Sequence, residues 1–402
     1  MRPLHAHPQH YAWGSAQDLP RFLGRDPDGR PWAELWYGAH PSAPSILDAA
    51  GPLDAAVTED PRGMLGDDVV NAFGSRLPYL LKLIAPERPL SLQVHPSRSH
   101  AAESFAAENA AGLPLDSPHR NYRDDNHKPE MVLALTKFEA VCGFRAPRRA
   151  AQILAGLDTD LSDRLHTLLV ENLSAHGMRA AFRTLVSPSL RPDAAAVAAV
   201  VAACGRRVAA GTSPSPRIDR TVVRLHEHFP GDPGVVANLL LNPVTLQPGE
   251  AMYVPEGAIH AYLSGFGVEV MAASDNVLRA GLTAKRVDVE EMLQCVSVQA
   301  APPQRVAPER LTPSTVAYFA PIDDFQLSVT TLDGGGDVAD PVARYLVPGS
   351  GPRILLCLDG ELAVSAGGST LRLPAGRALF VAAEDGDLHV AGQGRVIQAS
   401  VP

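Results

Sequence analysis

The segment LQPGEAMYVPEGAIHAYLS, residues 246–264, restricts the possible folds more than any other part of the chain. Gly249 permits a turn, and the apolar run after it has the composition of a strand. Pro255 and Gly257 then favour a second turn, after which His260 begins another strand. Two strands joined by such tight turns predict antiparallel β structure, with the His260 imidazole directed toward its interior.

Short apolar runs bounded by proline and glycine extend this β pattern over residues 1–145 and 232–300. Between them, residues 146–231 are rich in Ala, Leu and Arg, with apolar residues three and four apart, which predicts a helical insertion. A proline-rich linker, 301–314, precedes residues 315–402, where short strands alternate with glycines. We therefore predict a mainly β protein with an α insertion and a separate C-terminal domain of antiparallel sandwich or jelly-roll type.

Composition excludes several classes of protein. The 402 residues carry a formal net charge of −9 without a basic stripe, so a nucleic-acid partner is not expected. No apolar run approaches the ~20 residues of a membrane-spanning helix, and the N-terminal residues show no secretory signal. The four cysteines lie more than fifty residues apart without a C-x-x-C pair. These features predict a cytoplasmic protein with no membrane partner and with reduced thiols.

A second segment, LSLQVHPS, contains two potential metal ligands. Gln93 and His95 are two residues apart, so on a strand their side chains project from the same face. An imidazole and an amide oxygen, joined by one carboxylate, form a ligand set that suits zinc. Glu130 in NHKPEMVLAL is the natural carboxylate, and Lys128 would lie beside it on an extended segment.

The motifs QVHP, HKPE and PxGxxHAY occur in this order, with YAWGS and AELWYGAHPSAPS upstream. Together they resemble the type I phosphomannose isomerases, a zinc-dependent family of cupins, over nearly the whole chain. The resemblance implies a cupin-type jelly-roll catalytic barrel, interrupted by the helical insertion, and a second, C-terminal jelly roll without a metal site. It also implies one Zn²⁺ per chain, bound by Gln93, His95, Glu130 and His260.

The same resemblance implies the other residues of the site. Arg279 matches the family's active-site arginine, and either Lys128 or Glu269 is the proton shuttle. The residues expected to bind substrate are Trp13, Lys82, His127, Tyr262, Asp275 and Lys285. Simpler interpretations exist for three of them: Asp275 and Arg279 can form a surface ion pair, and Lys82 can be a strand lysine that extends to solvent.

The activity implied is interconversion of mannose 6-phosphate and fructose 6-phosphate by proton transfer through an enediol, serving mannose catabolism or GDP-mannose synthesis. The expected partner is a small sugar phosphate, and the expected state is a monomer. One alternative is a cupin oxygenase with iron on two histidines and one carboxylate, against which the fourth ligand Gln93 argues. The other is a non-catalytic cupin that binds sugar or has a structural role only. The C-terminal segment PAGRALFVAA fits that description, because Phe380 stands near the position of the ligand histidine.

Overall fold

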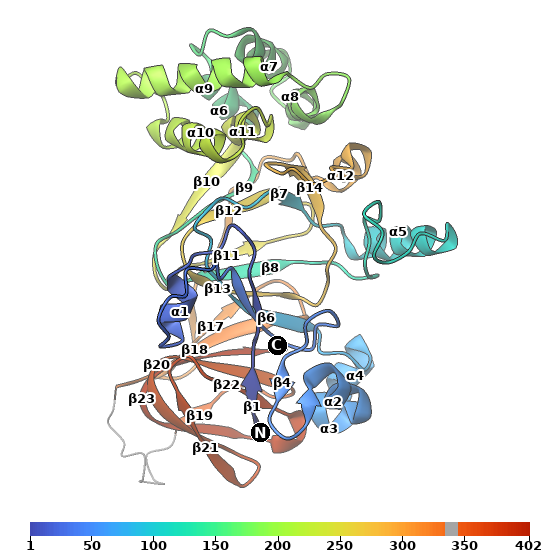
Figure 1. Ribbon diagram of the computed structural model, residues 1–402, viewed down its shortest axis with the longest axis vertical. Helices are drawn as coiled ribbons and strands as arrows, with labels where there is room; N and C mark the ends of the chain where they lie inside the picture. Colours follow the sequence, from blue (N-terminus) through green and yellow to red (C-terminus); the bar gives the residue numbers. More distant parts are fainter. Residues whose placement is uncertain (334–344) are drawn as a thin grey trace.

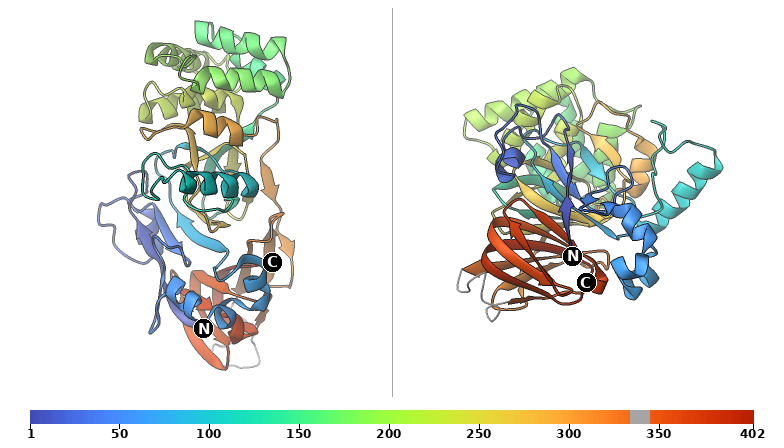
Figure 2. Two further views of the ribbon diagram at one scale, coloured as in Figure 1. Left: turned by 90° about the vertical axis from the view of Figure 1, so that its right-hand side faces the viewer. Right: turned by 60° about the horizontal axis from the view of Figure 1, so that its bottom comes forward.

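The computed structural model describes residues 1–333 and 345–402 (Figure 1). Residues 334–344 of the predicted C-terminal domain lie outside the described part. The strands form three sheets, and a group of helices lies at one end of the elongated molecule (Figures 1 and 2). The two sheets in the middle of the molecule carry the candidate site.

Two antiparallel sheets form the middle of the molecule. The five-stranded sheet has the order β10 (Leu241–Leu246), β9 (Phe138–Phe144), β12 (His260–Ser264), β7 (Leu92–Val94) and β14 (Leu278–Gly281). The seven-stranded sheet has the order β15 (Gln304–Val306), β11 (Ala251–Val254), β8 (Glu130–Ala134), β13 (Gly267–Ala272), β6 (Tyr79–Ile84), β3 (Glu34–Tyr37) and β2 (His7–Gln9). Val132 and Val254 of the seven-stranded sheet share one buried apolar cluster with Ala140 and Tyr262 of the five-stranded sheet. The two sheets therefore pack face to face.

A third sheet is formed mainly by the C-terminal strands. Its main order is β16 (Glu309–Arg310), β17 (Thr315–Phe319), β18 (Gln326–Asp333), β23 (Leu388–Ser400), β20 (Arg353–Ala366), β22 (Ala378–Val381), β1 (Arg2–His5), β4 (Ile46–Leu47) and β5 (Gly51–Pro52). Two further strands pair with members of this sheet: β19 (Tyr345–Val347) pairs with β23, and β21 (Ser369–Pro374) pairs with β20. The first strand of the chain thus joins the C-terminal sheet, whereas the sequence placed residues 1–145 in the catalytic domain. Such long-range pairing leaves no local signal, because alternation is the same in either sheet.

The helical cluster lies between β9 and β10 in the chain. Its helices are α6 (Pro147–Leu154), α7 (Asp160–Glu171), α8 (Ala175–Val186), α9 (Ala194–Ala209), α10 (Pro216–His228) and α11 (Gly234–Ala237), followed by the 3₁₀ turn η1 (Asn238–Leu240). Local sequence sets the starts of two of them: Thr159 and Ser162 form a capping box at α7, and the Asp193 carboxylate caps α9. The apolar faces share a core with Val141 of the five-stranded sheet, which they therefore cover.

Further helices occur where the sequence suggested mainly β structure. They are α1 (Asp18–Phe22), α2 (Leu53–Glu59), α3 (Pro61–Leu65), α4 (Asp67–Phe73) and α5 (Arg98–Ala110). Later in the chain come α12 (Val289–Cys295), capped by the Asp288 carboxylate, and the 3₁₀ turn η2 (Ala383–Asp385). None of the helices in residues 1–333 or 345–402 has the length and apolar character needed to cross a bilayer.

The layers follow one another along the molecule as helices, five-stranded sheet, seven-stranded sheet and C-terminal sheet (Figure 1). Leu81 and Val268 on the outer side of the seven-stranded sheet share an apolar core with Leu327 and Ile354 of the C-terminal sheet. Sheets dominate the structure, and helices are inserted between their strands. The predicted fold class, mainly β with an α insertion, is confirmed.

Candidate metal centre and active site

Two histidines and one glutamate meet between the two central sheets. His95 directly follows β7, His260 begins β12, and Glu130 begins β8 of the opposite sheet. His95 Nε2 lies 3.1 Å from Glu130 Oε1, and His260 Nε2 lies 3.3 Å from Glu130 Oε2. All three side chains are buried. Gln93 is the cross-strand partner of His260, so the structure brings the four predicted ligands to one place.

The hydrogen bonds around this cluster fix the orientation of both imidazole rings. His95 Nδ1 lies 2.7 Å from the Asn276 carbonyl oxygen, and His260 Nδ1 lies 3.0 Å from the Ala258 carbonyl oxygen. A ring nitrogen facing a carbonyl must donate, so each Nε2 presents a lone pair to the carboxylate. His95 Nε2 indeed has no hydrogen-bond partner among the described residues. Burial also lowers the pKa of His95 to about 4, which keeps the imidazole neutral.

A dication between these atoms would satisfy two imidazole lone pairs and one carboxylate at once. Gln93 fits as an additional ligand, because its amide nitrogen faces Ser91 Oγ at 3.4 Å and leaves the amide oxygen free. Burial opposes ionisation of Glu130, but its interactions with His95 and Lys128 outweigh this and hold the pKa of this carboxyl well below its usual range. The donor set therefore fits zinc.

A cavity of about 680 Å³ opens beside this cluster. Gln93 belongs to both, because it lies in the ligand group and also lines the cavity. The cavity is large enough for a sugar phosphate, since small-molecule sites commonly span ~300–1,000 Å³. Seven of the residues predicted for the site line it: Trp13, Lys82, Gln93, Lys128, Asp275, Arg279 and Lys285.

Three cations that line the cavity have no carboxylate partner among the described residues. Arg123, Arg279 and Lys285 all line this space, and none forms an ion pair with a described residue. Burial and then the charge of Arg123 lower the pKa of Arg279; burial and then the charge of Arg279 lower the pKa of Lys285. The three cations therefore lie close enough to repel one another. An anion such as a phosphate would relieve this repulsion.

The cavity wall opposite Gln93 holds a buried ion-pair group around Lys82. Its ammonium lies 3.4 Å from Glu269 Oε2, 3.9 Å from Glu34 Oε2 and 4.9 Å from the centre of the Trp36 ring. Lys82 is only 6% exposed, so the interpretation of a strand lysine that extends to solvent is wrong. Burial and the charge of Glu130 raise the pKa of Glu269 to about 7, although Lys82 opposes this shift.

The two proton-shuttle candidates occupy different positions. Lys128 lines the cavity, and its ammonium lies 3.3 Å from Glu130 Oε1. Glu269 is buried beneath the wall and does not line the cavity. Tyr262 is buried too, and its hydroxyl lies 3.5 Å from Glu130 Oε2, beside the His–Glu–His cluster and not on the cavity wall.

The interpretation of Asp275 and Arg279 as a surface ion pair is wrong. Asp275 pairs with His40 at 3.1 Å, and Arg279 lies on β14 beside Gln93 of β7. The segment is not helical, so the spacing of four residues does not bring the two side chains together. Arg279 is directed to the cavity as the resemblance implied.

His127 does not line the cavity, in contrast to the expectation that it binds substrate. Its ring contacts Glu256 and lies 3.1 Å from Asp324, which belongs to the C-terminal part of the chain. Burial disfavours its protonation, but Asp324 and Glu256 outweigh this and raise the pKa of His127. His127 therefore links the catalytic sheets to the C-terminal sheet.

Several cavity residues were missed by the reasoning from sequence. The main ones are Tyr11, Glu34, Trp36, Arg88 and Arg123. The alternation in the strand ELWY offered a signal for two of them, because Glu34 and Trp36 share a face. Arg123 precedes HKPE in an irregular segment, where no periodicity indicates its direction.

Comparison with known proteins gives a consistent result. Residues 1–147 match the family model described as phosphomannose isomerase type I, catalytic domain. The mannose-6-phosphate isomerase of Escherichia coli (strain K12) is 36% identical over 397 residues, which is 96% of both chains. The human mannose-6-phosphate isomerase is 32% identical over 95% of this chain and 93% of its own length.

Solved structures of this family superpose over the whole chain. The apo form of mannose 6-phosphate isomerase from Salmonella typhimurium has a TM-score of 0.87 at 33% identity, covering 100% of this chain and 99% of that chain. A mannose 6-phosphate isomerase bound with zinc and yttrium has the same TM-score, identity and coverage.

Proposed function

The chain belongs to the type I phosphomannose isomerase family, and from this premise we propose that it interconverts mannose 6-phosphate and fructose 6-phosphate with the help of one zinc ion. A single observation supports this most directly. A buried His–Glu–His cluster lies beside a cavity whose cations Arg123, Arg279 and Lys285 have no carboxylate partner among the described residues, and Gln93 next to the cluster is the cross-strand neighbour of Arg279. Such a cavity can hold a phosphate at one end while the reacting carbons lie near the cluster.

We assign the zinc to Gln93, His95, Glu130 and His260. A zinc ion bound there supplies Lewis-acid polarisation of sugar oxygens and orients them. At both imidazoles Nδ1 donates to a backbone carbonyl oxygen. That arrangement fixes the ring orientation and leaves both Nε2 atoms available as ligands.

The cationic end binds and orients the phosphate. We assign Lys285 and Arg123 to the phosphate itself, since neither has a carboxylate partner in the described part of the chain. Arg279 lies closer to the reacting end, because it is the cross-strand neighbour of Gln93. Its planar guanidinium can donate two hydrogen bonds to the oxygens that become negative in the enediolate.

Proton transfer between C1 and C2 requires a group that reaches the substrate. We assign this role to Lys128, because it lines the cavity and Glu269 does not. Lys128 takes the proton from one carbon of the sugar and returns it to the neighbouring carbon. Glu269 instead holds Lys82 in the wall by their 3.4 Å ion pair, and Lys82 donates to sugar hydroxyls with Trp13, Trp36 and Asp275 beside it.

The two alternatives are less well supported by the site. An iron oxygenase needs an open face for dioxygen, whereas the cavity beside this cluster is lined by lysines and arginines that suit a phosphate. A non-catalytic sugar-binding protein would not require a buried histidine nitrogen without a partner. We further propose that the enzyme works as a monomer in the cytoplasm, without nucleic acid or membrane.

The decisive experiment is an isomerase assay on the purified chain. Conversion of mannose 6-phosphate to fructose 6-phosphate should stop after chelation and return when zinc is added. Mannose without phosphate is the matched substrate control and should be converted far more slowly, because it cannot use the cationic end. Dioxygen consumption on iron loading, or an absence of turnover after zinc is restored, would reject the proposal.

A further inference from the structure

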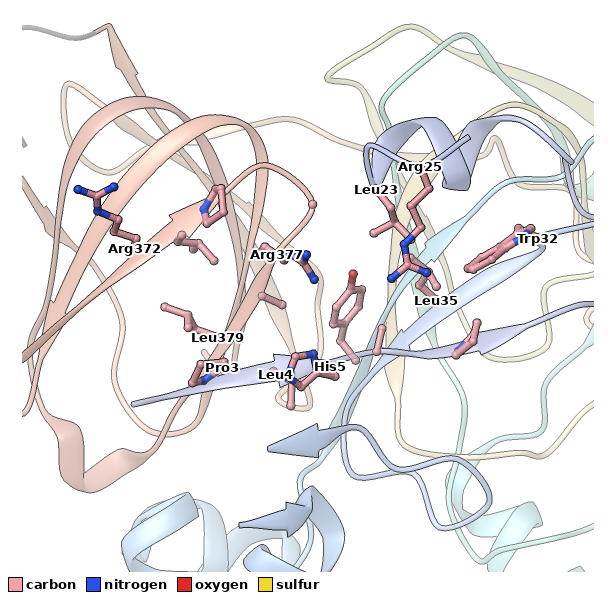
Figure 3. Close-up of a pocket in the computed structure, with 17 residues that line it drawn as sticks. Pro3, Leu4, His5, Leu23, Arg25, Trp32, Leu35, Arg372, Arg377 and Leu379 are labelled. Atoms are coloured by element: carbon pink, nitrogen blue, oxygen red, sulfur yellow. The ribbon is translucent and has the colours of Figure 1, made fainter. Parts of the chain in front are cut away.

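A second cavity, of about 600 Å³, lies between the first strands of the chain and the C-terminal sheet (Figure 3). It shares no lining residue with the substrate cavity. Three arginines line it, Arg25, Arg372 and Arg377, and no carboxylate does. Much of the remaining wall is apolar, with Leu23, Leu35 and Trp32 among its residues. A space of this size with an excess of positive charge is suited to an organic anion.

Strand β3 separates the two cavities. Leu35 and Tyr37 line the second cavity, whereas Glu34 and Trp36 line the substrate cavity. This division follows from the alternation of side chains along a strand. The second cavity is therefore a distinct site on the opposite face of β3 and not an extension of the first.

Within the described part of the chain, two of the three arginines have guanidinium groups without a partner. Arg372 pairs with Glu361 at 3.5 Å, and the nearby His5 pairs with Asp48 at 2.7 Å. Arg25 and Arg377 form no ion pair or side-chain hydrogen bond with any residue in the ranges 1–333 and 345–402. Figure 3 shows them approaching the cavity from opposite sides, Arg25 from the segment after α1 and Arg377 from the C-terminal sheet.

The backbone holds both arginines in place. Gly376 has a φ of +76°, and a Cβ added there would lie 3.0 Å from the Phe22 carbonyl oxygen. The turn Pro374–Arg377 thus packs closely on the end of α1, which precedes Arg25. The Arg25 guanidinium carbon lies 6.0 Å from the centre of the Trp32 ring, a weak cation–π contact that restrains the side chain.

A buried hydroxyl completes the set of donors. Tyr37 lines the cavity, is only 2% exposed, and makes no side-chain hydrogen bond to a described residue. Burial raises the pKa of Tyr37 and the charge of Arg377 partly opposes this, so the phenol stays protonated and lies within the field of that arginine. A protonated phenol without a partner can donate to a ligand.

We propose that this cavity binds a small organic anion. Its phosphate or carboxylate group accepts hydrogen bonds from Arg25, Arg377 and Tyr37, because guanidinium groups match the geometry of both oxyanions. Its apolar or aromatic body packs against Leu23, Leu35 and Trp32. The turn PAGR, which lacks a metal ligand, thus has a role of its own in placing Arg377.

Titration calorimetry on the zinc-loaded full chain tests this proposal with phenyl phosphate and benzoate as probes. The wild type should bind at least one of the two probes, and the probe that binds more tightly shows whether phosphate or carboxylate is preferred. The double variant Arg25→Ala/Arg377→Ala should weaken this binding at least tenfold. Arg372→Ala is the matched control and should bind as the wild type does, because Arg372 is already paired with Glu361.

A second variant and a second probe separate the parts of the proposal. Tyr37→Phe should weaken binding several-fold while its circular dichroism and melting temperature stay close to wild type, since the hydroxyl has no partner to lose. Inorganic phosphate should bind more weakly than phenyl phosphate, because it leaves the apolar wall uncovered. Absence of saturable binding by the wild type, or equal binding by wild type and double variant, would overturn the site.

Discussion

Two turns of the molecule have similar backbone conformations but present different side chains. The turn before β12 contains Pro255 and Gly257, and the turn before β22 contains Pro374 and Gly376. Both glycines have a left-handed φ, +74° and +76°. Three residues after the glycine, the first turn presents His260 to Glu130, whereas the second presents Leu379 to an apolar core. The turn therefore positions a side chain, and the chemistry of that side chain decides whether the position serves a metal.

The largest effect is expected from His260→Ala, which removes the ligand from the first turn. Zinc affinity should fall by more than the ~10–100-fold that loss of a ligand-orienting group causes, and turnover should fall with it. Metal content after gel filtration and the isomerase rate measure both. The reciprocal change, Leu379→His, should bind no second zinc, because no carboxylate lines its surroundings. Full zinc occupancy in His260→Ala would contradict the ligand assignment.

Arg279→Ala should lower kcat by about 10²–10³-fold with zinc content unchanged, as loss of a transition-state donor commonly does. The reason is its position beside Gln93 at the reacting end of the cavity. Arg279→Lys should restore little, because an ammonium cannot give two parallel hydrogen bonds. A rise in KM alone would instead show that Arg279 only anchors the phosphate.

The proton-shuttle assignment predicts unequal effects of two variants. Lys128→Ala should reduce kcat by about 10²-fold or more, within the range of general acid–base catalysis. Glu269→Gln should lower kcat by less, about tenfold, because an amide can still hold Lys82 by a hydrogen bond. Steady-state rates and their pH profiles for both variants provide the measurement. A greater loss in Glu269→Gln would transfer the role to Glu269.

Acid should destabilise the metal-free protein because His95, which lies beside His260, becomes protonated on unfolding. The pKa of His95 is lowered from 6.5 to about 4, so the unfolded chain binds a proton that the folded chain does not. Stability is therefore lost as pH falls from 6.5 toward 4, by up to about 3 kcal/mol. Urea unfolding after chelation, compared between wild type and His95→Gln, measures this. An equal pH slope in both proteins would refute it.

The smallest effect should be the same in both turns. Gly257→Ala and Gly376→Ala should each lower the free energy of unfolding by about 1–2 kcal/mol, because alanine is strained at positive φ. In both, the added Cβ would also lie 3.0 Å from a backbone carbonyl oxygen, that of Cys295 or of Phe22. Thermal unfolding of the two variants gives the comparison. Only the first should also lose zinc affinity, since it alone precedes a ligand.

Much of the site was predictable because its signals are local. Gln93 and His95 are two residues apart in one extended segment, and Pro255 and Gly257 mark the turn before His260. The helical insertion was visible from its apolar spacing for the same reason. The pairing of Asp275 with His40 and of His127 with Asp324 was not predictable, because each joins residues distant in the chain.

The sequence by itself determined the fold class, and it indicated the proposed metal ligands and the turns that present them, since these depend on residue identity and on the two-residue period of strands. Only the tertiary structure decided which strands became neighbours. It placed β1 in the C-terminal sheet and directed Glu34 and Tyr37 of β3 to two separate cavities. The physical reason is that a strand pattern records which residues share a face, while the partner of that face is chosen by packing over the whole chain.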